Sequence, residues 1–202
     1  MHQSARFLNY HLKTNLHIFK WLIIISIIIW GLACYQQKEI RVQKLQQLIH
    51  QQKKQMNQLQ QEVTKVKTVK RIMAFYGCNN ELIYREIMKT WDPVMVAVII
   101  GIESEYRQYA ISSADCYGLM QISWEHGLTD PFDIRTNIRF GACYLKEQFK
   151  QFKTVDGAIW AYNAGPERVG KFMPEETKAY IRRVKVMMEA YRCQELGMIS
   201  ET

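Results

Sequence analysis

The feature that most constrains this chain is an uncharged apolar segment near its start, residues 21–35, with the sequence WLIIISIIIWGLACY. It is short for a membrane span, which needs about 20 residues. Ile18 and Phe19 extend it across Lys20, whose ammonium can reach lipid headgroups. Aromatic residues near its ends suit the membrane interfaces: Trp21, Trp30 and Tyr35. We therefore expect a membrane anchor at 21–35, preceded by a short N-terminal tail at 1–20.

Two other interpretations of the apolar segment stay open. A cleaved signal peptide has a similar apolar core. The tetrapeptide GLAC is similar to a lipoprotein signal that would acylate Cys34, although Gly31 stands where a branched apolar residue is usual. A core helix is disfavoured, because no neighbouring segment offers a matching apolar face.

Residues 36–76 predict a long helical stalk. Residues 36–75 contain neither glycine nor proline, and Gly77 would end the helix. Apolar residues at 3,4 spacing fit a heptad seam, with polar exceptions at Gln52 and Lys70: Val42, Leu45, Ile49, Met56, Leu59, Val63, Val66 and Met73. This seam predicts either a homo-oligomeric coiled coil through residues 42–73 or a solitary solvated helix.

The formal net charge of +8 is concentrated in the first third of the chain. Residues 36–75 carry nine basic and two acidic residues, whereas residues 76–202 carry fifteen basic and seventeen acidic ones. The C-terminal part therefore lacks the basic field that nucleic-acid binding needs, and we expect no nucleic acid partner. A basic scaffold that binds DNA or membrane is the weaker hypothesis, because the excess positive charge is confined to the predicted stalk. There it could lie along anionic lipid near the anchor.

Residues 77–202 predict one mainly α-helical domain, since no run alternates as a strand would. Cap residues and periodicity place its helices at Asn80–Lys89, from Pro93 to about Arg107, from Asp133 to about Phe152, at Asp156–Tyr162, and from Pro174 to about Cys193.

The cysteines of this domain show neither CxxC nor Cys/His spacing, so we expect no metal site, and no cofactor is expected either. They are compatible with four free thiols or with two disulfides. The pairs Cys116–Cys143 and Cys78–Cys193 would join the middle of the domain and its two ends.

The stretch PVMVAVIIGIESEYRQ at residues 93–108 holds the candidate catalytic residue. Its helix is apolar on every face up to Ile102, which is typical of a buried helix, and Glu103 follows directly near the C-terminal end. Apolar surroundings and the negative end of the helix both raise the pKa of a carboxyl group, which suits a general acid. Glu105 lies about 200° around the helix and should face solvent. The competing interpretation of Glu103 is a paired carboxylate at the end of a core helix.

Glu103 belongs to the motif IESEY, and four further motifs follow it in order along the chain. The set comprises IESEY at 102–106, YGLMQIS at 117–123, NIRFGACYL at 137–145, AYNAGPERV at 161–169 and EETKAYIRRV at 175–184. Together they resemble the lysozyme-like catalytic domain of the lytic transglycosylases, of the soluble-lytic-transglycosylase type, over roughly residues 79–190. The resemblance implies a lysozyme-like helical domain that follows the membrane segment and the coiled-coil-like helix.

The resemblance also implies the chemistry. Glu103 would protonate the bond between N-acetylmuramic acid and N-acetylglucosamine in peptidoglycan, and would then act as base on the C6 hydroxyl of the same sugar. The product is a 1,6-anhydro-muramoyl end. The family needs no second carboxylate, unlike the retaining glycosidases.

The same motifs imply the binding residues. Those expected to contact the glycan strand are Ser104, Gly118, Met120, Gln121, Tyr162 and Asn163, while Tyr180 would place its hydroxyl on the catalytic carboxyl. Outside the family context, Ser104 is a helix-end hydroxyl and Met120 a core residue. Two positions depart from the pattern: Cys116 replaces a small residue and Trp160 adds bulk before AYNAGP.

Peptidoglycan lies outside the cytoplasmic membrane, so this function predicts a single-pass protein with its C-terminal domain on the periplasmic side. The charges that flank residues 21–35 weakly favour the opposite orientation, with three basic residues before the segment and five between it and residue 55. Five ordered motifs outweigh this difference. The alternative function is a catalytically weak glycan-binding component of a secretion, conjugation or phage apparatus, and the presence of Glu103 favours the enzyme.

Overall fold

The computed structural model describes the backbone of residues 2–195 and the side chains of residues 19–191. Contacts within the chain define two compact units, Met1–Leu59 and Gln60–Thr202. Helix α1, His2–Phe75, supplies the whole of the first unit and the beginning of the second. It ends just before Gly77, whose φ of +70° suits glycine, as the sequence predicts.

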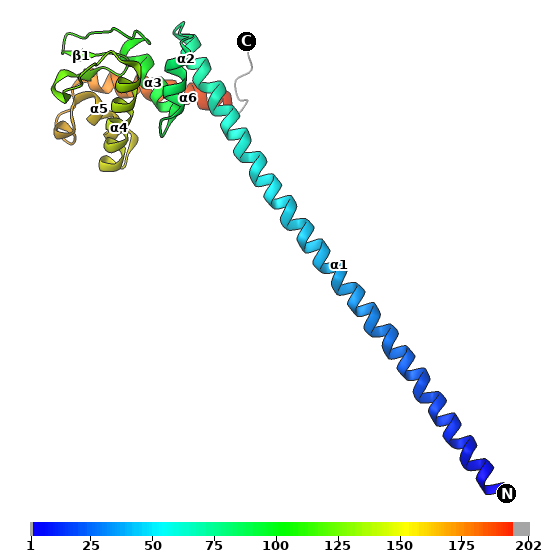
Figure 1. Cartoon of the computed structure of the whole chain (residues 1–202). Helices are drawn as coiled ribbons and strands as arrows, with labels where there is room; N and C mark the ends of the chain where they lie inside the picture. Colours follow the sequence, from blue (N-terminus) through cyan, green and yellow to red (C-terminus); the bar gives the residue numbers. More distant parts are fainter. Residues whose placement is uncertain (1, 196–202) are drawn as a thin grey trace. The chain divides into compact units, whose positions relative to one another are not determined.

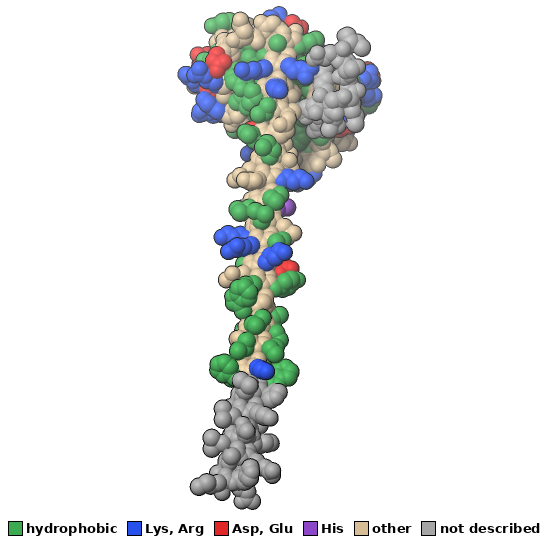
Figure 2. Space-filling model, turned by 90° about the vertical axis from the view of Figure 1, so that its right-hand side faces the viewer, with side chains coloured by type: hydrophobic (Ala, Val, Ile, Leu, Met, Phe, Trp, Pro, Cys, Tyr) green, Lys and Arg blue, Asp and Glu red, His purple; other side chains and the backbone are tan. Residues whose placement is uncertain are grey.

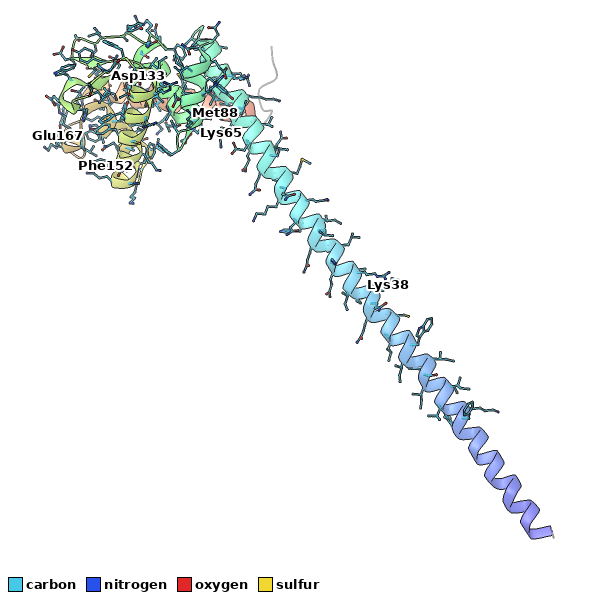
Figure 3. All side chains as sticks on the ribbon, in the orientation of Figure 1. Lys38, Lys65, Met88, Asp133, Phe152 and Glu167 are labelled. Carbon is cyan, nitrogen blue, oxygen red and sulfur yellow. The ribbon has the colours of Figure 1, made fainter. Side chains whose placement is uncertain are left out.

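The part of α1 in the first unit carries exposed apolar side chains. Every described side chain from Phe19 to Leu59 is exposed, and Figure 2 shows hydrophobic groups on several sides of this part of the helix. Its N-terminal part is long and apolar enough to cross a membrane. Lys38, which extends from the helix in Figure 3, lies beyond the uncharged run.

The end of α1 belongs to the core of the second unit. Val69 and Ile72 are fully buried and Met73 is 4% exposed, whereas the sequence placed the start of the domain at residue 77. The part of the heptad pattern that follows Val63 thus belongs to the domain and not to the exposed stalk. A second copy of α1 cannot pair with the whole predicted range 42–73, because the protein's own core covers its end.

The second unit is mainly α-helical, which confirms the predicted class. Its elements are α2 Glu81–Met88, α3 Pro93–Ser104, β1 Cys116–Tyr117, β2 Ile122–Ser123, the 3-10 helix η1 Trp124–His126, α4 Ile134–Phe152, α5 Val155–Ala164, the 3-10 helix η2 Pro166–Arg168 and α6 Glu175–Glu195. The two short strands pair antiparallel.

Side-chain caps determine where several helices begin. The Asn80 carboxamide accepts from the backbone N–H groups of the first turn of α2, and the Asp92 carboxylate accepts from the first turn of α3. Asp133 caps α4, which runs from it to Phe152 in Figure 3. These three starts agree with the sequence, because short polar caps act locally.

Helix α3 occupies the centre of the domain. Its residues from Met95 to Gly101 are buried, and the helix packs against α2 and α6. Helix α4 covers α2 and α5, and α5 contacts α6 (Figure 1). The apolar sequence of α3 therefore has neighbours on all sides, and its polar C-terminal end is held at a defined place.

The contribution of α1 to the core is measurable by truncation. A fragment of residues 77–202 loses Val69 and Ile72, whereas a fragment of residues 60–202 keeps both. Burial of each aliphatic side chain contributes about 1.5–3 kcal/mol. The shorter fragment should therefore unfold in urea with a free energy lower by at least about 3 kcal/mol. Equal stability of the two fragments would show that the end of α1 is dispensable.

Candidate active site

Glu103 lies in the last turn of α3, where the helix ends three residues earlier than predicted. Glu105 and Tyr106 both have left-handed backbone conformations, with φ of 52° and 61°, which stops the helix. The Tyr106 hydroxyl donates to the carbonyl of Ala97 at 2.9 Å and anchors this bend. Glu103 remains partly exposed and Glu105 is exposed, as the helical spacing predicts.

The carboxyl group of Glu103 contacts a tyrosine from a distant helix. The Tyr180 hydroxyl on α6 donates to Oε1 of Glu103 at 2.5 Å, and Tyr180 is only 3% exposed. This is the contact that the sequence motifs imply. It joins the end of α3 to the second turn of α6, and the two residues are 77 positions apart in the chain.

The surroundings of Glu103 favour its protonated form. Burial raises the pKa of its carboxyl group from 4.5 to about 7, while the hydrogen bond from Tyr180 and the charge of Arg183 act in the opposite direction. A large fraction of the carboxyl groups is therefore protonated at neutral pH. Such a group can donate a proton and, once ionised, accept one.

Two tyrosines beside Glu103 keep their protons. The pKa values of Tyr162 and Tyr180 are raised well above 10.0, by burial first and by the charge of Glu103 second. The Tyr162 hydroxyl donates to the carbonyl of Met120 at 2.8 Å, so its proton is already committed to a partner inside the protein. Asn163, the next residue on α5, is exposed.

The turn from Gly118 to Gln121 is held by one buried amide. Asn137 is 1% exposed, and its Nδ2 donates to the carbonyls of Tyr117 at 2.9 Å and Pro131 at 2.8 Å, while its Oδ1 accepts from the N–H of Met120 at 2.8 Å. Gly118 has φ of +75°, and a Cβ there would lie 2.4 Å from Nδ2 of Asn137. The close approach of Asn137 thus requires glycine at position 118.

Three residues predicted to bind substrate use their side chains inside the protein instead. Ser104 is 1% exposed and donates to the carbonyl of Leu119 at 2.8 Å. Met120 is fully buried against Gly141, where a Cβ would lie 2.6 Å from its sulfur. Gln121 is partly exposed, and its Nε2 donates to the carbonyl of Gly118 at 2.9 Å. These contacts correspond to positioning roles, and for Met120 to the alternative of core packing.

One charged residue near Glu103 escaped the motif analysis. The guanidinium of Arg183 lies 5.9 Å from the centre of the Tyr180 ring, and its charge acts on the pKa of Glu103. The sequence feature that could have indicated Arg183 is its position about one helical turn after Tyr180. Trp160, which departs from the family pattern by its bulk, is 8% exposed and belongs to the core.

The cysteines are free thiols where their side chains are described. Cys116 and Cys143 are not bonded to each other, so the suggested disulfide between them is wrong, and Cys78 is also free. Cys193 lies outside the described side chains. Burial raises the pKa of the Cys116 thiol, and the charge of Glu103 contributes in the same direction. Within residues 19–191 no group of three or more His, Cys, Asp or Glu side chains could hold a metal ion.

Comparison with known proteins identifies the domain. The family described as the transglycosylase SLT domain matches residues 82–184, just over half of the chain. The chain belongs to this family. The match confirms the resemblance found in the motifs and the lysozyme-like fold, and it makes the domain a lytic transglycosylase domain.

Individual relatives each cover part of this chain. A transglycosylase of Enterobacteria phage PRD1 is 30% identical over 97 residues, which are 46% of this chain and 36% of the phage protein. The 70 kDa soluble lytic transglycosylase of Escherichia coli is 25% identical with a TM-score of 0.48, over 59% of this chain and 25% of its own. The lytic transglycosylase Slt of Pseudomonas aeruginosa, solved as an inactive mutant, is 22% identical with a TM-score of 0.44, over 66% of this chain and 24% of its own. The chain thus spans about a third or less of each relative.

The hydrogen bonds of Asn137 predict a large loss on substitution. Asn137→Ala leaves two carbonyls and one N–H near the turn without their partner, and each unmade buried hydrogen bond costs about 1–3 kcal/mol. The free energy of unfolding in urea should fall by about 3 kcal/mol or more. The matched control is Asn163→Ala on an exposed site, which should change it by less than about 0.5 kcal/mol. Similar losses in both variants would contradict the positioning role of Asn137.

The raised pKa of Glu103 predicts a pH-dependent cost to stability. The folded protein retains a proton that the unfolded chain releases above pH 4.5, so stability decreases as pH rises from 4.5 to about 7. Glu103→Gln cannot ionise and should be more stable than the wild type by about 3 kcal/mol at pH 8.

The same difference should vanish near pH 4, where the unfolded chain also keeps its proton. Urea unfolding at several pH values measures it, and Glu105→Gln, two residues away on an exposed side chain, serves as the control. A Glu103→Gln variant that gains nothing at pH 8 would show that the carboxyl group is well solvated.

Proposed function

We propose that the protein is a membrane-tethered peptidoglycan lytic transglycosylase with Glu103 as its catalytic acid and base. The observation that carries the proposal is the partly exposed Glu103 carboxyl group, with a pKa of about 7 and a hydrogen bond from Tyr180, inside an SLT domain. The name of the phage relative, transglycosylase, supports the same reaction class.

In the first step Glu103 donates its proton to the oxygen that links N-acetylmuramic acid to N-acetylglucosamine, and the bond from C1 to this oxygen breaks. The C6 hydroxyl oxygen of the same muramoyl residue then bonds to C1, and Glu103 takes the proton that it releases. No water is consumed, so Glu103 returns to its protonated form and the strand ends in a 1,6-anhydro ring. A pKa near neutral serves both transfers.

The residues around Glu103 have separate tasks in this proposal. Tyr180 orients the carboxyl group and stabilises its ionised form, because its hydrogen bond lowers the pKa of Glu103. The Tyr162 ring and the exposed Asn163 side chain contact the sugar and its N-acetyl group. Ser104 and the backbone of Gly118–Gln121 keep this arrangement in place.

The tether is residues 21–35, held in the cytoplasmic membrane with the SLT domain on the periplasmic side. Support comes from the exposed apolar side chains of this part of α1 and from the location of the substrate. The exposed seam from Val42 to Val63 offers a surface for a second copy of α1, which would form a coiled coil between the membrane and the domain.

The products of cleavage test the reaction. The full-length protein in detergent is incubated with purified peptidoglycan, and the released fragments are analysed by mass spectrometry. We expect anhydro-muramoyl ends, and a loss of at least about 100-fold in Glu103→Gln, since general acid–base catalysis contributes about that much or more. Reducing ends would identify a hydrolase, and the absence of any product would favour a glycan-binding component.

A further inference from the structure

A pocket of about 260 Å³ lies between α2 and α4, and none of its lining residues takes part in the proposed reaction. The lining comes from the end of α2, the turn that follows it and one face of α4. Helical spacing places Tyr144 on the opposite face of α4, where its ring lies 5.8 Å from the Tyr162 ring. A ligand in this pocket would therefore leave the site around Glu103 open.

Three positively charged side chains line the pocket. Lys89 follows α2, and Arg139 and Lys146 lie two turns apart on α4, which is about 10 Å along the helix. All three residues are exposed. Arg139 and Lys146 form no ion pair with any residue whose side chain is described. Their charges are thus available to an anionic group.

The acidic residue of the lining is already neutralised. Glu86 is only 6% exposed, and its Oε1 lies 2.7 Å from Nζ of Lys89 and 3.8 Å from Nε of Arg135. Because two cations share this carboxylate, it leaves the charges of Arg139 and Lys146 unbalanced. The pocket therefore has an excess of positive charge although it contains a glutamate.

An apolar surface adjoins these charges. Trp91 is 38% exposed, and its Nε1 donates to the carbonyl of Ala142 at 3.0 Å, while its ring centre lies 5.3 Å from that of Phe149. These two contacts hold the indole ring in one orientation. A ring that is already ordered can pack against an apolar side chain of a ligand with little further loss of conformational entropy.

The charge of the whole domain argues against a bilayer or a nucleic acid as the ligand. Residues 76–202 carry fifteen basic and seventeen acidic residues, so the domain as a whole is not attracted to a large polyanion or to anionic lipid. A bilayer is also flat, whereas the buried Glu86 marks a recess. Single side chains of a protein can enter such a recess. Local complementarity therefore favours a peptide segment.

We propose that this pocket docks an acidic segment of a partner protein, with an apolar side chain packed on Trp91 and carboxylates beside Arg139 and Lys146. Carboxylates seven residues apart on a helix, or three residues apart on an extended segment, are separated by about 10 Å and match these two cations. The partner would determine where in the cell envelope the domain acts, while the site around Glu103 stays accessible to its substrate.

A short peptide tests the pocket. The probe is a fluorescein-labelled peptide of glutamates around a central leucine, with blocked ends, and fluorescence anisotropy follows its titration into the full-length protein in nonionic detergent. The double variant Arg139→Gln with Lys146→Gln should bind the probe about 4-fold to 25-fold more weakly, because each exposed ion pair contributes about twofold to fivefold. Arg85→Gln with Lys150→Gln changes the net charge equally at exposed sites outside the pocket and should bind like the wild type.

The exposed thiol of Cys143 reports on the same pocket, because it belongs to the lining. Saturating peptide should slow the alkylation of Cys143 by iodoacetamide, measured by mass spectrometry. The rate at Cys116, on β1, should not change. Cleavage of purified peptidoglycan by the double variant Arg139→Gln with Lys146→Gln should equal that of the wild type.

Four results overturn the proposal: no binding by the wild type, an equal loss in both double variants, an unchanged rate at Cys143, or reduced cleavage in the pocket variant. Phosphatidylglycerol added to the detergent is the competing ligand. If it protects Cys143 and the peptide does not, the pocket recognises a lipid headgroup and the proposal is wrong. The binding measurements hold whether or not the wild type cleaves peptidoglycan, so they are independent of the proposed function.

Discussion

The arrangement around Glu103 depends on the buried carboxamide of Asn137. A buried amide is stable only when its donors and its acceptor find partners, and here all three partners are backbone groups: those of Tyr117 and Met120 in one turn, and that of Pro131 in the loop before α4. The turn from Gly118 to Gln121 also presents the carbonyl of Leu119 to Ser104 and the carbonyl of Met120 to Tyr162. Helices α3, α4 and α5 thus all contact one short loop, and α3 carries Glu103 in its last turn.

Local signals in the sequence were sufficient for the starts of several helices, and they made Glu103 a candidate. Asn80 and Asp92 predict the starts of α2 and α3 because a capping side chain bonds to backbone only two or three residues away. Glu103 stands out because an apolar helix that ends in a carboxylate makes an unusual charge environment. The contact with Tyr180 followed from the family motifs, since no local rule links residues so far apart in the chain.

The roles of the turn residues were harder to predict, because a motif records the kind of residue but not the atoms that it uses. Ser104 and Met120 occupy motif positions, yet their side chains serve the protein interior. The end of α1 posed a similar difficulty. A 3,4 pattern of apolar residues fits a coiled coil and a domain core equally well, and only the contacts of Val69 and Ile72 distinguish the two.

The burial of Glu103 has a consequence for how this chain changes over generations. A carboxyl group that the fold must keep protonated makes the protein less stable than a neutral side chain of the same shape would. Random substitution at this position therefore meets little resistance from folding, and a lineage with no use for the chemistry would gain stability by losing the acid. A glutamate at the end of a helix of valines and isoleucines therefore carries a cost in stability that the fold itself does not require.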